Sequence, residues 1–151
     1  MGRREELLRT EAEGWEDLNS LISRANPEAL ESPGPNAEGW AVRDLMWHVA
    51  YWCHDTAQAF GRMRDGIFDA AAEPDGPTQI DPINDAQLEL SRGMALDEVR
   101  REWFRARAEM LERFGELAEL TPEADQWFDE TGPLHYAKHL PDLRTSLGSE
   151  R

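Results

Sequence analysis

The sequence has a single cysteine, Cys53, and no long run of apolar residues. One cysteine cannot form a disulfide within the chain, which is typical of proteins kept in a reducing cytoplasm. No apolar stretch approaches the ~18 residues that a membrane-spanning helix needs. The N-terminus, Met-Gly-Arg-Arg-Glu-Glu, also lacks the apolar segment of a secretory signal. We therefore expect a cytoplasmic protein without membrane segments.

Basic residues are also few. The chain has 16 Lys and Arg against 31 Asp and Glu, a formal net charge of -15. Such a charge repels the phosphates of nucleic acids and the head groups of anionic membranes. This excludes both as expected partners and disfavours a DNA-binding regulator.

The remaining composition is that of a folded protein. With 151 residues, an ordinary hydrophobic fraction of 40% and six tryptophans, the chain can bury one core. No internal repeat divides it. We predict a single domain over residues 1–151.

Apolar residues recur at three- and four-residue steps in three stretches, each of which predicts an amphipathic helix. The stretches run from Glu5 to about Ala25, from about Ala41 to Arg64, and from Leu96 to a stop at Pro122. A fourth helix is expected from Pro133, because proline is favoured at a first helical position. Pro141 predicts a kink in it, or its end and a short helix after it. The loop between the first two helices is marked by Pro27, Pro33, Gly34, Pro35 and Gly39.

Between Gly66 and Ala95 the helical pattern disappears. Five residues make a sustained helix improbable there, although residues 86–90 are compatible with a short turn; these are Pro74, Gly76, Pro77, Pro82 and Gly93. Such a segment is longer than the ~2–8 residues that join antiparallel helices, and it can run the length of a helix and return. We therefore expect the second and third helices to be parallel. The predicted fold is all-α, a four-helix bundle with a long connection between helices 2 and 3.

Several polar and aromatic residues receive structural interpretations. The many Glu residues are expected to form a solvated face, and His54 is expected to face solvent. Cys53 lies in an apolar stripe and is expected in the core. Trp15, Trp52 and Trp103 are expected in the core or in the wall of a pocket. Trp40 is expected to fix the start of the second helix. Trp127 and Phe128, in a loop, are expected to line the mouth of a pocket.

Two histidines in Leu134-His135-Tyr136-Ala137-Lys138-His139-Leu140 are spaced four residues apart. On a helix of ~3.6 residues per turn they share one face, and their imidazoles can reach one metal ion. The residue after His135 is Tyr136 instead of the glutamate of the zinc-protease motif. The pair needs a third ligand from elsewhere.

His48 is the candidate for that ligand. Helical geometry places it ~120° from the centre of the apolar stripe of its helix, on the shoulder of the bundle. A histidine there is more often a partly exposed or hydrogen-bonded residue than a ligand. Periodicity by itself therefore does not assign it to a metal.

The motifs around these histidines resemble a known family. Trp40, then Val42-Arg43-Asp44-Leu45, then His48 is similar to the second helix of the DinB-like superfamily. This group includes the YfiT-type proteins, proposed to be metal-dependent hydrolases, and the N-terminal domain of mycothiol-dependent maleylpyruvate isomerase. The pair His135 and His139, followed by Leu-Pro-Asp-Leu, resembles the C-terminal motif of that superfamily. The resemblance covers essentially the whole chain.

The resemblance implies a four-helix bundle with one divalent metal ion, usually zinc or nickel, held by a histidine triad. Carried over, the ligands are His48, His135 and His139. One position departs from the family, which commonly has Thr or Ser where Ala41 stands. Ala41 cannot cap the second helix with a hydroxyl, a loss of typically ~1 kcal/mol, although Asp44 can still complement its first turn.

Three imidazoles leave one position open on a tetrahedral ion, as in catalytic zinc sites. That position can hold a water of lowered pKa or the thiolate of a small molecule. Family members imply a low-molecular-weight thiol such as mycothiol or bacillithiol as co-substrate. Asp44 and Asp142 are candidates to orient the imidazoles, with capping or solvent-facing roles as the alternative for each.

Two functions are left open. The first is a metal-dependent enzyme that acts on a small electrophilic metabolite. It would transfer or add a small thiol to the metabolite, isomerise the metabolite, or hydrolyse it. The second is a non-catalytic metal-binding or stress-response protein whose metal is structural or vestigial. The open coordination position favours the first, and the resemblance also brings a homodimer into consideration. The catalytic residues, the substrate and the identity of the metal do not follow from the sequence.

Overall fold

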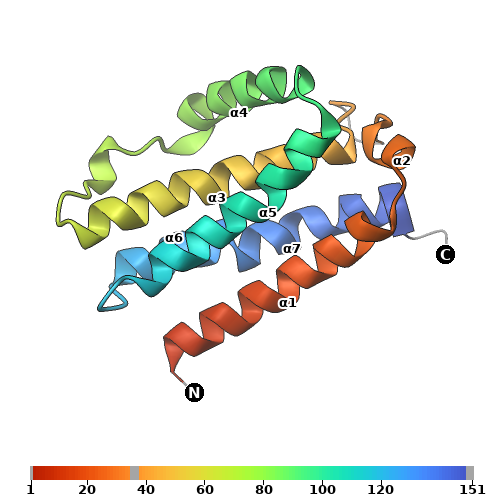
Figure 1. The fold of residues 1–151 in the computed structure, drawn as a ribbon. Helices are drawn as coiled ribbons and strands as arrows, with labels where there is room; N and C mark the ends of the chain where they lie inside the picture. Colours follow the sequence, from red (N-terminus) through yellow and green to blue (C-terminus); the bar gives the residue numbers. More distant parts are fainter. Residues whose placement is uncertain (1, 35–37, 149–151) are drawn as a thin grey trace. The chain divides into compact units, whose positions relative to one another are not determined.

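The structure, a computed structural model, describes residues 2–34 and 38–148 (Figure 1). This part of the chain is helical and contains no β-strand, only an isolated bridge between Pro33 and Ala41. The all-α prediction is confirmed. The elements are α1 (Arg3–Arg24), α2 (Pro27–Glu31), α3 (Val42–Arg64), the 3-10 helix η1 (Ala70–Ala72), α4 (Gly76–Arg92), α5 (Leu96–Gly115), α6 (Pro122–Thr131), α7 (Pro133–Leu143) and the π-helix η2 (Arg144–Gly148).

The helices belong to two compact units. The first comprises Met1–Leu45 and Leu120–Arg151, and the second Met46–Glu119. Helix α3 starts in the first unit and continues into the second. The four-helix bundle and the single domain of residues 1–151 stay predictions.

In the first unit, α1 packs against α6, α7 and η2. Most of the apolar stripe expected on α1 (Leu8, Trp15, Leu18, Ile22 and Ala25) is buried, with Trp15, Leu18 and Ile22 at most 8% exposed and Ala25 half-buried. Leu8 was wrongly placed in the stripe: it is 38% exposed, and Leu7 is buried instead. Burial of such side chains contributes roughly 1.5–3 kcal/mol each. The stripe is therefore the main attachment of α1.

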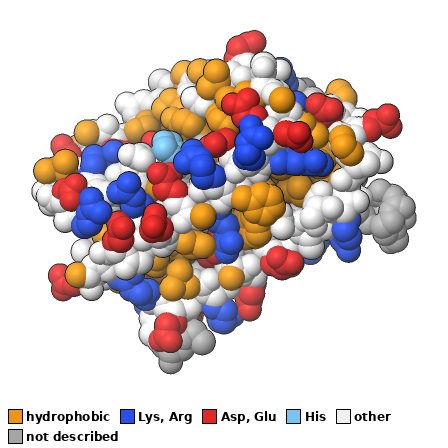
Figure 2. All heavy atoms as spheres, in the orientation of Figure 1, with side chains coloured by type: hydrophobic (Ala, Val, Ile, Leu, Met, Phe, Trp, Pro, Cys, Tyr) orange, Lys and Arg blue, Asp and Glu red, His pale blue; other side chains and the backbone are white. Residues whose placement is uncertain are grey.

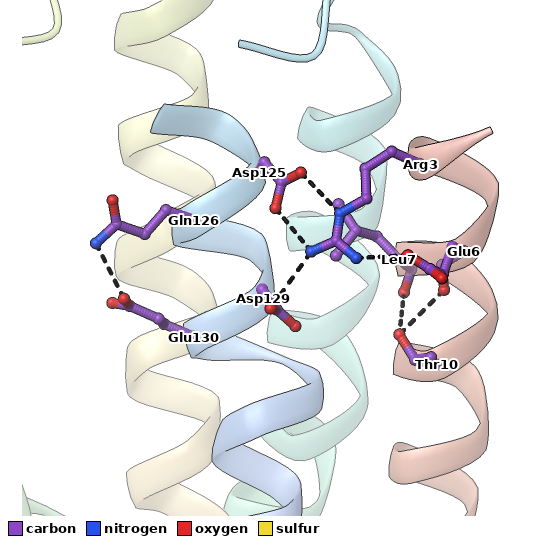
Figure 3. Close-up of polar contacts among 8 residues, drawn as sticks. All are labelled: Arg3, Glu6, Leu7, Thr10, Asp125, Gln126, Asp129 and Glu130. Carbon is purple, nitrogen blue, oxygen red and sulfur yellow. Dashed lines mark hydrogen bonds and ion pairs between the residues drawn. The ribbon is translucent and has the colours of Figure 1, made fainter. Parts of the chain in front are cut away.

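The N-terminal end of α1 is bound to α6 by Arg3 (Figure 3). Its guanidinium contacts both carboxylate oxygens of Asp125, with Nε at 2.8 Å and Nη2 at 2.9 Å, and Nη2 lies 3.5 Å from Asp129. The hydrogen bond from Arg3 lowers the pKa of Asp125. This bidentate contact fixes the orientation of the two helices more than it adds to their stability, because the pair is at the surface.

Two segments of the first unit that were predicted as loops contain helices, and those predictions are wrong. Pro27 begins α2 behind Asn26, whose side chain accepts the N–H of Ala29 at 2.8 Å. Pro122 begins α6 behind Thr121, whose hydroxyl accepts the N–H of Ala124 at 3.1 Å. Proline after a capping side chain starts a helix, since its missing N–H falls where no helical partner exists. Pro35, placed in the first loop, lies outside the described residues.

The last helix begins at Pro133, as predicted, but does not end before Pro141. It continues to Leu143 and passes into the π-helix η2. Pro141 provides no N–H for the carbonyl of Ala137. Thr145 donates its hydroxyl to the carbonyl of Pro141 at 3.0 Å, and Leu143 is buried. These contacts continue the helical path beyond the proline.

In the second unit, α3 and α5 are parallel, as the sequence predicted. His54 contacts Glu109, Phe60 packs on Phe114 with ring centroids 5.4 Å apart, and Arg64 contacts Glu116. The residue numbers rise together along both helices, which defines their common direction. Buried side chains on α5 include Val99, Trp103, Ala106, Met110 and Phe114.

The connection between α3 and α5 contains the 17-residue helix α4, so the prediction of no sustained helix there is wrong. Its glycines and Pro77 lie at the ends: Gly76 takes a φ of +73°, Pro77 follows in the first turn and Gly93 caps the C-terminus. Pro82 alone lies inside, at a typical cost of ~3 kcal/mol.

Two indoles of α3 offset this cost. Trp47 donates its N–H to Gln87 at 3.1 Å, and Trp52 donates to Asn84 at 2.8 Å. The residue numbers fall on α4 as they rise on α3, so α4 returns antiparallel to α3. Tertiary hydrogen bonds therefore hold a helix that periodicity did not reveal.

Among the described helices, none combines the length and apolarity needed to cross a bilayer. Basic side chains are interspersed with acidic ones on the face drawn in Figure 2. Pairs such as Arg9–Glu13 at 3.2 Å and Arg105–Glu102 at 2.6 Å are local helical neighbours. Much of the acidic excess is thus solvated surface, as expected.

Candidate functional site

The two C-terminal histidines lie together on α7, as the spacing predicted. Nε2 of His139 is 3.0 Å from Nε2 of His135, and the rings meet edge to face with centroids 4.7 Å apart. Two nitrogens bound to one zinc-type ion at ~2.0–2.1 Å, with an angle of ~90–110° between the bonds, are separated by roughly 3 Å. The two rings are within hydrogen-bond distance of each other, and the same separation fits a two-nitrogen metal chelate.

The protonation state of His139 also suits ligation. Burial lowers the pKa of His139 to about 4, Lys138 lowers it as well, and Asp142 opposes the shift. The imidazole is consequently neutral near pH 7, which is the form that binds a metal. Asp142 itself is exposed on the next turn, in agreement with the solvent-facing alternative.

A buried hydrogen bond fixes the face that α7 presents. Tyr136 donates its hydroxyl to Oε2 of Glu11 on α1 at 2.8 Å, and both residues are 1% exposed. Gly14 and Gly132 leave room for the pair, because a Cβ at either glycine would lie 3.2 Å from Tyr136 or Glu11. Helical geometry places His139 and His135 ~60° and ~100° around the axis from Tyr136, on the same side. The bond thus orients both imidazoles.

Sequence reasoning missed Glu11, which was assigned with the other glutamates to a solvated face. A signal was present, since Glu11 stands between Leu7 and Trp15 at four-residue steps and so occupies a position of the apolar stripe. A carboxylate at such a position requires a buried donor. Tyr136 on α7 supplies it.

His48 lies on α3, in the part of that helix that belongs to the second unit, and is half-buried. One turn earlier, Asp44 is 5% exposed and its Oδ2 accepts the N–H of Ala41 at 2.8 Å. Asp44 thus supplies half of a capping box at the start of α3, where Ala41 lacks a hydroxyl. The capping interpretation of Asp44 is confirmed.

The three-histidine ligand set stays a prediction, because His48 belongs to the second unit and the pair on α7 belongs to the first. The fourth histidine, His54, has Nδ1 2.8 Å from Glu109 on α5, and its side chain is 44% exposed. It faces solvent as expected, but it is ion-paired when protonated. His54 therefore provides a natural comparison for the three candidate ligands.

The remaining candidates have structural positions. Cys53, Trp15 and Trp103 are buried as predicted, and Trp52 is half-buried. Phe128 is fully buried on α6, so the prediction that it lines a pocket mouth is wrong. Although Phe128 lies close to His135 along the chain, helix packing places its side chain in the core.

A family model described as "Mycothiol maleylpyruvate isomerase N-terminal domain" matches residues 12–145. The match includes α3 with His48 and α7 with both other histidines. No curated protein and no solved structure matches the chain.

Proposed function

Because the chain belongs to the mycothiol maleylpyruvate isomerase N-terminal domain family, part of the DinB-like superfamily, we propose that it is a metal-dependent enzyme that uses a small thiol. Its ligands would be His48, His135 and His139. The observation that carries the proposal is the 3.0 Å separation of the two Nε2 atoms on α7. The depressed pKa of His139 supports it, because a neutral imidazole keeps one nitrogen lone pair that can bind a metal at neutral pH.

The nitrogen donors of the expected ligands limit the choice of metal ion. Three neutral imidazoles favour zinc or nickel over magnesium or calcium, which prefer oxygen ligands. A divalent ion held this way would act as a Lewis acid and lower the pKa of a thiol or water at its open coordination position. The protein would keep His139 neutral and would hold the pair on α7 in a fixed orientation through Tyr136 and Glu11.

The proposed reaction joins the sulfur of a mycothiol- or bacillithiol-type thiol to an electrophilic carbon of a small metabolite. A transferase, an isomerase and a hydrolase each fit this chemistry; in the hydrolase, water would replace the thiol. The thiol gives up its proton to solvent, and the thiolate, which is the nucleophilic form, adds to one carbon of an activated C=C bond, whose π electrons take up a proton from water. In an isomerase the S–C bond would break again after rotation and release the thiolate. The acidic surface of the protein disfavours polyanionic substrates.

The first experiment tests the metal. Protein purified without an affinity tag is analysed for its elements, with His48→Ala, His135→Ala and His139→Ala compared individually with His54→Ala. We expect about one equivalent of zinc or nickel in the wild type and in His54→Ala, and far less than one equivalent in the other three. Full metal content in His48→Ala would contradict the triad and leave only the pair on α7.

The second experiment tests the thiol. Consumption of mycothiol or bacillithiol is followed with electrophilic substrates such as maleylpyruvate, in the metal-loaded wild type, His48→Ala and His54→Ala. Turnover that His48→Ala abolishes and His54→Ala retains would support an enzyme. Stoichiometric metal without any thiol-dependent turnover would instead favour the non-catalytic metal-binding protein.

A further inference from the structure

One carboxylate of the second unit lacks a hydrogen-bonding partner. Oδ2 of Asp55 on α3 is buried, and no donor from the described residues lies within hydrogen-bond distance. The nearby cations are occupied elsewhere: Nη2 of Arg62 binds Glu73 at 3.1 Å, and His54 binds Glu109 at 2.8 Å. A buried carboxylate oxygen without a donor is costly, typically by 1–3 kcal/mol or more.

The charges around Asp55 also favour a cation at this position. Burial raises the pKa of Asp55, Glu73 raises it further, and Arg62 and His54 lower it less. Asp55 and Glu73 together carry two negative charges, against the one permanent positive charge of Arg62. This surrounding attracts a cation and repels a carboxylate.

Two aromatic side chains adjoin this carboxylate. Tyr51 and Trp52 precede Asp55 by four and three residues, the spacings that place helical side chains next to one another. Their rings meet edge to face with centroids 5.0 Å apart, and the indole N–H of Trp52 is held by Asn84 at 2.8 Å. Aromatic rings attract an organic ammonium group, and a neighbouring carboxylate adds to that attraction.

We propose that Tyr51, Trp52 and the half-buried carboxylate of Asp55 bind the ammonium group of a ligand, which donates an N–H to that carboxylate. His48 precedes Asp55 by seven residues, two helical turns, so the two lie on the same face of α3 about 10 Å apart along its axis. A ligand with an ammonium at Asp55 could extend its thiol or electrophilic carbon towards His48. Only this last link rests on the proposed function.

The test uses metal-free protein, so that it stands or falls independently of the metal proposal. Butylammonium, butanol and butyrate are titrated separately while the indole N–H signal of Trp52 is followed by NMR. The variant is Asp55→Asn, and the control is Asp65→Asn, which removes the same charge from an exposed carboxylate bound to Arg64 at 3.1 Å. We expect saturable binding of butylammonium alone, weakened at least tenfold by Asp55→Asn and less than twofold by Asp65→Asn.

A wild-type measurement guards against a variant that does not fold. The ¹³C carboxyl signal of Asp55 is titrated with pH, with and without saturating butylammonium, and its pKa should fall when the cation is bound. The proposal is overturned by an unmoved Asp55 signal, by equal binding of butanol or butyrate, or by equal losses in the two variants. Equal losses would indicate general attraction to an acidic surface.

Discussion

The hydroxyl of Tyr136 donates a 2.8 Å hydrogen bond to Glu11, and both side chains are almost completely buried. It joins residues far apart in the sequence, on α1 and α7, immediately beside His135. A polar bond of this kind costs desolvation but allows only one rotation of α7 against α1. It therefore determines the direction in which the histidine pair points.

Removing that hydroxyl should destabilise the protein. In Tyr136→Phe the carboxylate of Glu11 stays buried and loses this donor, so we expect a loss of ~1–3 kcal/mol in the free energy of unfolding. Urea denaturation of metal-free protein measures it. The chain has one other tyrosine, and Tyr51→Phe is the matched control with an expected change within ~0.5 kcal/mol. Equal effects of the two substitutions would contradict the role of the bond.

Orientation of the ligands provides a separate prediction. If the bond orients α7, Tyr136→Phe should weaken cobalt(II) binding about 10–100-fold and broaden its visible spectrum. A merely destabilising substitution in α1, such as Leu18→Ala, should lower stability without this change in the spectrum of the folded, metal-loaded protein. An unchanged spectrum in Tyr136→Phe would leave the bond with a structural role only.

The pKa of His139 predicts how stability depends on pH. His139 titrates at about 4 when folded and near its ordinary value of 6.5 when unfolded. Its neutral form therefore favours the folded state above pH ~6.5, and this contribution is lost as the pH falls from 6.5 to 4, because the unfolded chain binds the proton first. We expect metal-free wild type to lose roughly 3 kcal/mol more than His139→Gln across this interval. Parallel stability curves for the two proteins would refute it.

The start of α3 can be improved. Asp44 already accepts the N–H of Ala41, but the other half of a capping box, a hydroxyl at position 41, is missing. Ala41→Ser should therefore raise the free energy of unfolding by ~0.5–2 kcal/mol, and Asp44→Ala should lower it by a similar amount. Thermal denaturation of both variants checks this. Stabilisation by Ala41→Ser that persists in the Asp44→Ala background would show that the hydroxyl acts alone.

Helix α4 contains one proline where it is costly and one where it is not. Pro82→Ala should restore the hydrogen bond to Thr78 and raise the protection of residues 82–92 from hydrogen exchange by roughly 1–2 kcal/mol, after allowance for the more flexible unfolded chain. Pro77→Ala, in the first turn, should change it by less than ~0.5 kcal/mol. Similar effects at both positions would mean that the interior proline is not strained.

Local patterns predicted much of the helical structure. The boundaries near Arg3, Val42, Leu96 and Pro133 followed from apolar periodicity and from proline at a helix start. The pairing of His135 with His139 followed as well, because the distance between residues four apart is a property of the helix alone. The missed helices α2 and α6 share one error, since proline was taken as a stop where a capping residue before it made it a start. Helix α4 was missed for another reason, because it contains Pro82 in its interior and is held by hydrogen bonds from α3.

What the sequence determined by itself was therefore set within a turn or two of helix: the helical class, the two imidazoles on one face, and the acidic surface. The tertiary structure decided which polar residues are buried, because burial depends on a partner that is distant along the chain. Glu11 became a core residue through Tyr136, and α4 persists through its hydrogen bonds to Trp47 and Trp52. Apolar periodicity shows which face of a helix is buried, and only the packed structure shows which residues that face contacts.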